Sequence, residues 1–154
     1  GISRATFFNY FPQKELILRE VAAARVERLK GIIAEYAAGG HAPTLDGIVG
    51  LILKLCEENA RITRHSKKIL LETLFRQASQ GLMLGAREKA IQALAKVIAR
   101  VPRRRGVSAE VVAETLFAVY IATMLEWLMR EGVPDKWLMV TMRKRLRLAW
   151  EGAA

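Results

Sequence analysis

The first fifteen residues, Gly1–Glu15, read GISRATFFNYFPQKE and carry the most informative pattern in the sequence. Gly1 can adopt the left-handed backbone that a tight turn between helices requires. Ser3 is a candidate N-cap for a short helix that begins at Arg4. A glycine turn followed by a short helix with small and polar residues at its start is typical of the recognition half of a helix-turn-helix, in which those residues meet base edges in the major groove. The opening segment therefore predicts DNA recognition.

The remainder of the chain predicts helices throughout, because apolar residues recur at steps of three and four and no run shows sustained alternation. Thr44 and Ser108 are candidate N-caps. Asn59 and a loop marked by Gly81 and Gly85 are expected to interrupt the helices. The fold class predicted is an all-α helical bundle. Its expected helices cover about 13–38, 45–58, 61–79, 86–101, 108–130 and 135–150.

Two C-terminal segments, 108–130 and 135–150, are apolar on more than one side. A surface helix of a monomer needs only one apolar face. Because most soluble oligomers are symmetric dimers, the additional apolar faces predict a homodimer interface formed by both segments. The alternative is that both helices are simply central helices of one bundle.

Composition narrows the class of protein. A chain of 154 residues suggests one domain, and 52% hydrophobic residues argue against disorder. Cys56 alone cannot form an internal disulfide, and with only His41 and His65 the sequence predicts neither a metal site nor a cofactor. The longest stretch without charge, Thr115–Leu125, has 11 residues. This falls short of the roughly 20 residues of a membrane helix, so we expect a cytoplasmic protein without a membrane partner.

The charge balance is strongly positive, with 25 basic and 15 acidic residues and a formal net charge of +10. Residues 1–40 contain six basic and four acidic residues, whereas twelve basic residues fall in three later runs at 61–68, 100–105 and 143–147. Such runs are most often solvated helix faces; contact with DNA phosphate or an anionic membrane is the alternative. The bulk charge thus adds only weak support for DNA binding.

The opening segment resembles the tetracycline-repressor (TetR) family of transcriptional regulators, and the resemblance extends along nearly the whole chain. It implies a helical bundle in which residues 1–15 are a partial DNA-binding helix-turn-helix and residues 16–154 a ligand-binding and dimerisation domain. The family places two further helices before the glycine turn, so the chain is expected to begin within the motif and the complete parent protein to bind DNA. The matching elements are Gly1-x-Ser3, Thr6, the aromatic run Phe7-Phe8-x-Tyr10-Phe11, and Lys14-Glu15.

The resemblance also implies individual DNA contacts. Arg4 and Ala5 hold base-facing positions, where arginine could bind guanine O6 and N7 and alanine could pack on a thymine methyl. Phe8 stands where tyrosine is more usual, so it keeps an apolar contact and lacks a hydroxyl. The implied DNA-contacting set is completed by the cap Ser3, the phosphate positions Thr6, Tyr10 and Lys14, and the variable position Asn9.

In this family the middle helices form a ligand pocket. Aromatic and methionine side chains with a few polar groups suit a pocket for apolar small molecules, whereas ordinary core packing is the alternative for each residue. The candidate lining residues are Ile52, Cys56, Phe75, Met83, Phe117, Tyr120, Met124 and Trp127.

These expectations combine into one functional hypothesis. The sequence indicates a ligand-responsive transcriptional repressor that binds palindromic operator DNA as a homodimer and is released by a small apolar ligand. The alternative is a helical module that binds apolar ligands or lipids without binding DNA. No glycine-rich phosphate loop, nucleophile elbow or zincin motif is present, so neither catalytic residues nor an enzyme activity is expected.

Overall fold

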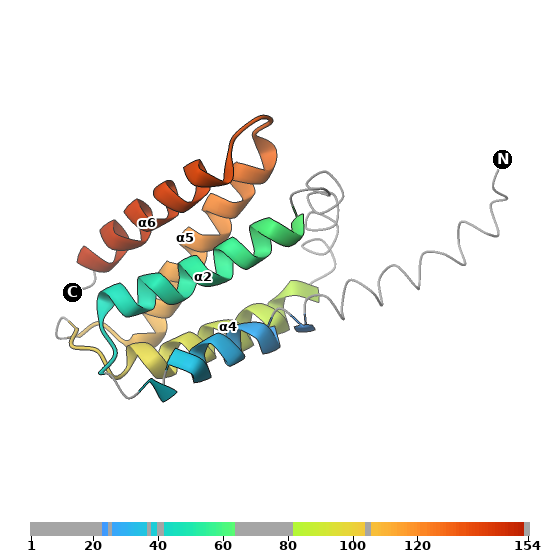
Figure 1. The fold of residues 1–154 in the computed structure, drawn as a ribbon. Coiled ribbons are helices and arrows are strands. Elements are labelled where there is room, and N and C mark those ends of the chain that lie inside the picture. The colour runs from blue at the N-terminus through green and yellow to red at the C-terminus, as the bar shows by residue number, and fades with distance from the viewer. Residues whose placement is uncertain are drawn as a thin grey trace, which may run out of the picture.

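The computed structural model describes residues 23–24, 26–36, 38–39, 42–63, 82–103 and 106–152. It contains helices α2 (Leu45–Thr63), α4 (Leu82–Ile98), α5 (Ala109–Met129) and α6 (Asp135–Glu151), and residues 26–36 are helical as well (Figure 1). These ranges include no strand. The all-α class predicted from the sequence is confirmed.

Helix α5 lies at the centre of the bundle. It packs against α4 on one side and α6 on the other, and it also touches α2. It is long and apolar enough to cross a membrane by length and composition alone, and 44% of its most apolar stretch is buried within the bundle. The buried residues of α5 are Ala109, Val112, Ala113, Leu116, Tyr120, Thr123, Met124, Trp127 and Leu128.

Helix α6 returns antiparallel to α5 after a short turn. Gly132 makes this turn with a φ of +70°, a backbone conformation that glycine adopts without strain. Leu138, Met142 and Leu146 recur at steps of four and are fully buried against α5 and α2. The predicted bounds of both C-terminal helices agree with the structure to within one residue.

Two predicted helix caps are present. The Ser108 hydroxyl accepts a hydrogen bond from the backbone N–H of Val111 at 3.2 Å, and the Thr44 hydroxyl accepts one from Gly47 at 3.1 Å. Each bond satisfies an N–H that the first turn of a helix leaves unpaired. The starts of α5 and α2 could therefore be predicted from the local sequence.

The predicted break at Asn59 is wrong, since α2 continues to Thr63. Asparagine favours helix ends because its side chain competes for nearby backbone groups. Here the Asn59 side chain instead donates a hydrogen bond to the Tyr120 hydroxyl at 2.7 Å. Because this hydrogen bond engages the Asn59 side chain, the side chain does not compete for backbone groups, and the helix continues to Thr63.

The predicted loop at Gly81–Gly85 is also placed wrongly, because α4 already begins at Leu82. Gly85 is exposed within this helix, and a helical glycine costs about 1 kcal/mol relative to alanine, which the rest of α4 offsets. At its other end α4 stops at Ile98, three residues early, and the Arg103 guanidinium donates hydrogen bonds to the carbonyls of Ile98 and Val101. The helix expected at 61–79 lies mostly outside the described residues.

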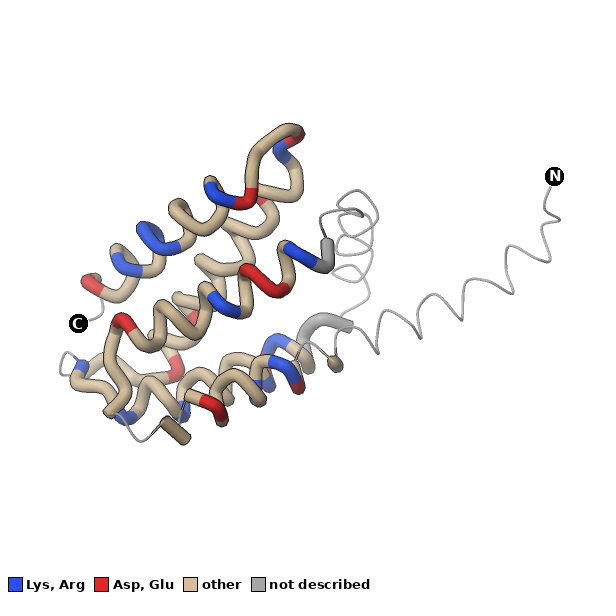
Figure 2. Tube along the Cα trace, viewed as in Figure 1, with Lys and Arg blue, Asp and Glu red and all other residues tan. Residues whose placement is uncertain are grey.

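Among the described residues, Lys and Arg occur along α2, α4 and α6 rather than in one cluster (Figure 2). Within the basic runs, Arg61 lies 3.8 Å from Glu57 on the same helix. Arg145 contacts Glu126 at 2.7 Å, and Arg147 pairs with Asp46. These contacts support the interpretation of the runs as solvated helix faces that also tie neighbouring helices together.

The helical segment 26–36 packs along α2, and one contact between them is unusually close. Val26, Leu29 and Ile32 are buried. The Tyr36 hydroxyl accepts a hydrogen bond from the backbone N–H of Thr44 at 3.1 Å. A Cβ atom added to Gly47 would lie only 1.8 Å from that hydroxyl oxygen, so the tyrosine can occupy this place only over a residue without a side chain.

Gly47→Ala is therefore expected to lower the free energy of unfolding by about 1–3 kcal/mol, the usual range for overpacking. Gly50→Ala is the matched control on the same helix, because nothing lies within 4 Å of its added Cβ. It should raise stability by up to about 1 kcal/mol through helix propensity. Urea unfolding followed by circular dichroism measures both; equal effects of the two substitutions would contradict the close approach of Tyr36.

Candidate functional site

One face of α2 carries a short series of buried side chains, two of which contact α5. Ile52, Cys56 and Asn59 are 4%, 0% and 7% exposed. They are spaced four and three residues apart, which places them on one side of the helix. Lys54 and Glu57, between them in sequence, point outward and are exposed.

The facing side of α5 supplies the other half of the site. The Cys56 sulfur lies 3.6 Å from the sulfur of Met124, and the Asn59 amide donates to the Tyr120 hydroxyl at 2.7 Å. The ring centroids of Phe117 and Tyr120 are 6.0 Å apart, within the range of favourable aromatic pairs. Two helices far apart in sequence thus meet through sulfur, aromatic and amide groups.

Six of the eight residues predicted to line a ligand pocket have side chains that the structure describes. Ile52 and Cys56 on α2, and Tyr120, Met124 and Trp127 on α5, are part of the hydrophobic core that all the helices share, and Phe117 packs half-buried against it. Met83 lies in α4, but its side chain is outside the described ones, as is the whole of Phe75. The predicted DNA contacts at Ser3, Arg4, Ala5, Thr6, Phe8, Asn9, Tyr10 and Lys14 also lie outside the described residues.

Asn59 is the site residue that the sequence analysis missed. Its polarity suggested a helix break, yet it follows Ile52 by seven residues and Cys56 by three, so the helical spacing already placed it on the same face. A buried amide in an apolar environment requires a hydrogen-bond partner. Only the packing of α5 on α2 shows that Tyr120 is that partner.

The chain as a whole can be compared with known proteins. No protein-family profile and no curated protein sequence matches it. Among solved structures it is similar to FadR of Thermus thermophilus, a TetR-family transcriptional repressor crystallised in complex with lauroyl-CoA. The TM-score is 0.67 at 25% sequence identity, and the alignment covers 98% of this chain and 78% of FadR. The chain has the TetR-type fold.

The TetR-type fold confirms the resemblance that the opening motif predicted. In this arrangement α5 and α6 are the two apolar C-terminal helices, and α2 is one of the middle helices that pack beneath them. The candidate residues Cys56 and Met124 therefore lie on the contact between a middle helix and the first of the C-terminal pair.

The thiol of Cys56 is held neutral by its surroundings. Burial raises its pKa to about 12, and the negative charges of Asp135 and Glu57 add to the increase. A neutral thiol behaves as a small apolar group and is a poor nucleophile. Cys56 therefore contributes packing to this face of α2.

The contact between α2 and α5 packs sulfur and aromatic side chains around one polar pair, Asn59 and Tyr120. Sulfur and aromatic side chains adapt their packing to apolar ligands, and the Asn59–Tyr120 pair offers hydrogen-bonding atoms in that apolar environment. Within the described residues, no group of three or more His, Cys, Asp or Glu side chains could hold a metal ion.

Because the thiol is buried, it should react with an aromatic disulfide reagent at mildly alkaline pH at least ~100-fold more slowly than the unfolded chain does. As Cys56 is the sole cysteine, the absorbance released per chain reports this one residue. Reaction in urea provides the reference rate. A native rate within a few-fold of that reference would contradict the burial of Cys56 against Met124.

Proposed function

We propose that the complete protein is a cytoplasmic, ligand-responsive transcriptional repressor that binds palindromic operator DNA as a homodimer. The observation that carries this proposal is the TetR-type fold, shared over 98% of the chain with a TetR-family repressor. The helix-turn-helix pattern of the opening segment supports it independently. Residues 1–15 form the end of the DNA-binding part, and residues 16–154 form the ligand-binding and dimerisation domain.

DNA recognition is assigned to the opening segment. Arg4 and Ala5 read base edges, while the other contacts hold the protein on the sugar-phosphate backbone. In a dimer the two recognition helices enter successive major grooves, which makes the operator a palindrome. The contacting residues are Ser3, Arg4, Ala5, Thr6, Phe8, Asn9, Tyr10 and Lys14.

The ligand is proposed to be a fatty acyl-CoA such as lauroyl-CoA. FadR of Thermus thermophilus is bound to lauroyl-CoA, and an acyl chain matches the apolar character of the contact between α2 and α5. The ligand must bind the arrangement that does not bind DNA more tightly, since otherwise it shifts nothing. The proposed lining residues are Ile52, Cys56, Phe75, Met83, Phe117, Tyr120, Met124 and Trp127.

The homodimer is proposed to form through α5 and α6. The large hydrophobic side chains that are well exposed in the described residues all lie on these two helices: Val111, Met129, Val140 and Leu148, at 53%, 57%, 47% and 71%. Exposed apolar groups gathered on adjacent helices mark interaction surfaces. A second copy, related by two-fold symmetry, would cover both sets at once.

The middle of the outward face of α5 is made of small residues. Thr115, Ala118 and Ala122 are exposed and follow Val111 at steps of four, three and four, so they line one side of the helix. Small side chains there allow the backbones of two α5 helices to approach closely, with the larger Val111 and Met129 at the ends. This pattern favours α5 as the centre of the interface.

Ala122→Glu is expected to convert the dimer to a monomer, because a two-fold axis places the new carboxylate in the interface twice. We expect the dimer dissociation constant to rise at least ~100-fold, which corresponds to about 2.7 kcal/mol. Sedimentation velocity measures the change. Ala99→Glu, an exposed alanine just beyond α4, is the control and should leave the dimer intact; a monomeric wild-type chain would contradict the interface itself.

For DNA binding, the complete protein with any residues encoded before Gly1 should select a palindromic sequence from random DNA. Arg4→Ala should weaken that binding by about 10–100-fold, the range for losing one bidentate base contact. Lauroyl-CoA should release the DNA, whereas CoA without an acyl chain should not. Fluorescence anisotropy at fixed salt measures all three.

Two results would overturn parts of this proposal. Binding without any sequence preference would remove the operator and favour a helical module that takes up apolar ligands or lipids. Selective DNA binding that lauroyl-CoA leaves unchanged would keep the regulator and exclude lauroyl-CoA as its ligand.

A further inference from the structure

The contact between segment 26–36 and α2 differs in kind at its two ends. The segment runs antiparallel to α2, so that Tyr36 meets the start of α2 at Gly47 while Arg28 meets its later part at Glu58. At the Tyr36 end the contact is close-packed and anchored by the hydrogen bond to Thr44. Sliding the segment along α2 would drive the tyrosine ring into the helix backbone.

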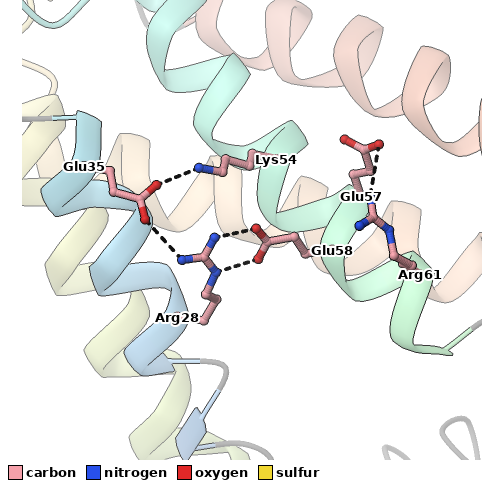
Figure 3. A network of polar contacts seen from close by, with 6 residues as sticks. All are labelled: Arg28, Glu35, Lys54, Glu57, Glu58 and Arg61. Atoms are coloured by element: carbon pink, nitrogen blue, oxygen red, sulfur yellow. Dashed lines mark hydrogen bonds and ion pairs between the residues drawn. The ribbon is translucent and has the colours of Figure 1, made fainter. Parts of the chain in front are cut away.

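At the other end an ion pair joins the segment to α2 (Figure 3), beside the buried side chains of Val26 and Leu29. The Arg28 guanidinium holds both carboxylate oxygens of Glu58, with Nε to Oε2 at 2.7 Å and Nη2 to Oε1 at 2.6 Å. Its third nitrogen lies 3.3 Å from Glu35 Oε1, and the other oxygen of Glu35 receives Lys54 Nζ at 2.7 Å. Two bonds from one planar fork set the orientation of the segment as well as its distance.

This ionic contact is accessible to solvent. The side chains of Arg28 and Glu58 are 44% and 28% exposed, so dissolved salt screens their attraction. Hydrogen bonds from Arg28 lower the pKa of Glu58, and those from Lys54 and then Arg28 lower that of Glu35, so both carboxylates are charged at neutral pH. Salt therefore weakens this ion pair, whereas it does not screen the packing of Tyr36 against Gly47.

We propose that Arg28 and Glu58 form a latch that sets the angle of segment 26–36 on α2, with Tyr36 over Gly47 as its pivot. A rotation about Tyr36 moves the Arg28 end of the segment the most. That end is the one nearest in sequence to residues 1–15, so Arg28 and Glu58 are positioning residues for DNA recognition. This consequence rests on the proposed function; the latch and pivot themselves do not.

The same turn of α2 carries the latch and the candidate ligand face. Glu58 binds Arg28 on the outer side, while its neighbour Asn59 binds Tyr120 and Cys56 contacts Met124 on the inner side. A helix turn is stiff, so displacement of its inner side chains would also displace Glu58. The latch thereby gives a ligand between α2 and α5 a mechanical route to segment 26–36.

Amide hydrogen exchange of the chain, without DNA or ligand, tests the latch. Glu58→Gln keeps the shape of the side chain and removes its charge. We expect exchange at residues 26–30 to accelerate about two- to fivefold, the range for loss of one exposed ion pair. Exchange at residues 34–36, beside the pivot, should change less, and the amides of α5 and α6 serve as the internal reference.

Glu57→Gln is the matched control. Glu57 precedes Glu58 on the same helix, but its partner Arg61 lies on α2 itself at 3.8 Å (Figure 3). It should leave exchange at residues 26–30 unchanged. In addition, raising NaCl from about 0.05 to about 1 M should accelerate exchange there in the wild type and much less in the Glu58→Gln variant.

The outcomes separate the latch from the repressor. Equal effects of Glu58→Gln and Glu57→Gln would overturn the latch, and equal acceleration along the whole of 26–36 would overturn the pivot. Faster exchange confined to residues 26–30 supports the latch and the pivot. If the complete protein then fails to bind an operator, only the proposed role of Arg28 and Glu58 in DNA recognition is overturned.

Discussion

Burial of α5 is the constraint on which the rest of this structure depends. A 21-residue helix with apolar side chains on more than one side cannot be covered by one neighbour. Helices α4 and α6 flank it, and α2 reaches it through Cys56 and Asn59. What remains outward is a narrow face of small residues ended by Val111 and Met129, and that remainder motivates the proposed dimer.

Helix α2 connects the parts of the proposed mechanism because its two faces have different chemistry. Inward it offers Ile52, Cys56 and Asn59 to α5, and outward it offers Lys54 and Glu58 to segment 26–36. Apolar packing on one side is insensitive to salt, whereas the ion pairs on the other side are screened by it. In the proposed mechanism, a ligand on the inner face of α2 would alter the ionic contact on its outer face.

Expectations from sequence succeeded where the interaction is local and failed where a distant partner decides. The caps Ser108 and Thr44 were predictable because each bonds a backbone N–H three residues away. The helix break predicted at Asn59 was wrong because the hydrogen-bond partner of its side chain, Tyr120, is 61 residues away in the sequence. Tyr36 over Gly47 left no signal beyond a glycine within a helix, since the reason for that glycine is a ring from another segment.

The sequence by itself determined the all-α class, the course of α5 and α6, and the resemblance to TetR regulators, because helical periodicity, caps and a recognition motif are written in neighbouring residues. Tertiary structure alone decided that Cys56 meets Met124, that Arg28 binds Glu58, and which face of α5 stays exposed. These contacts depend on the angle and register at which helices pack, and many side chains set that geometry jointly while none encodes it alone.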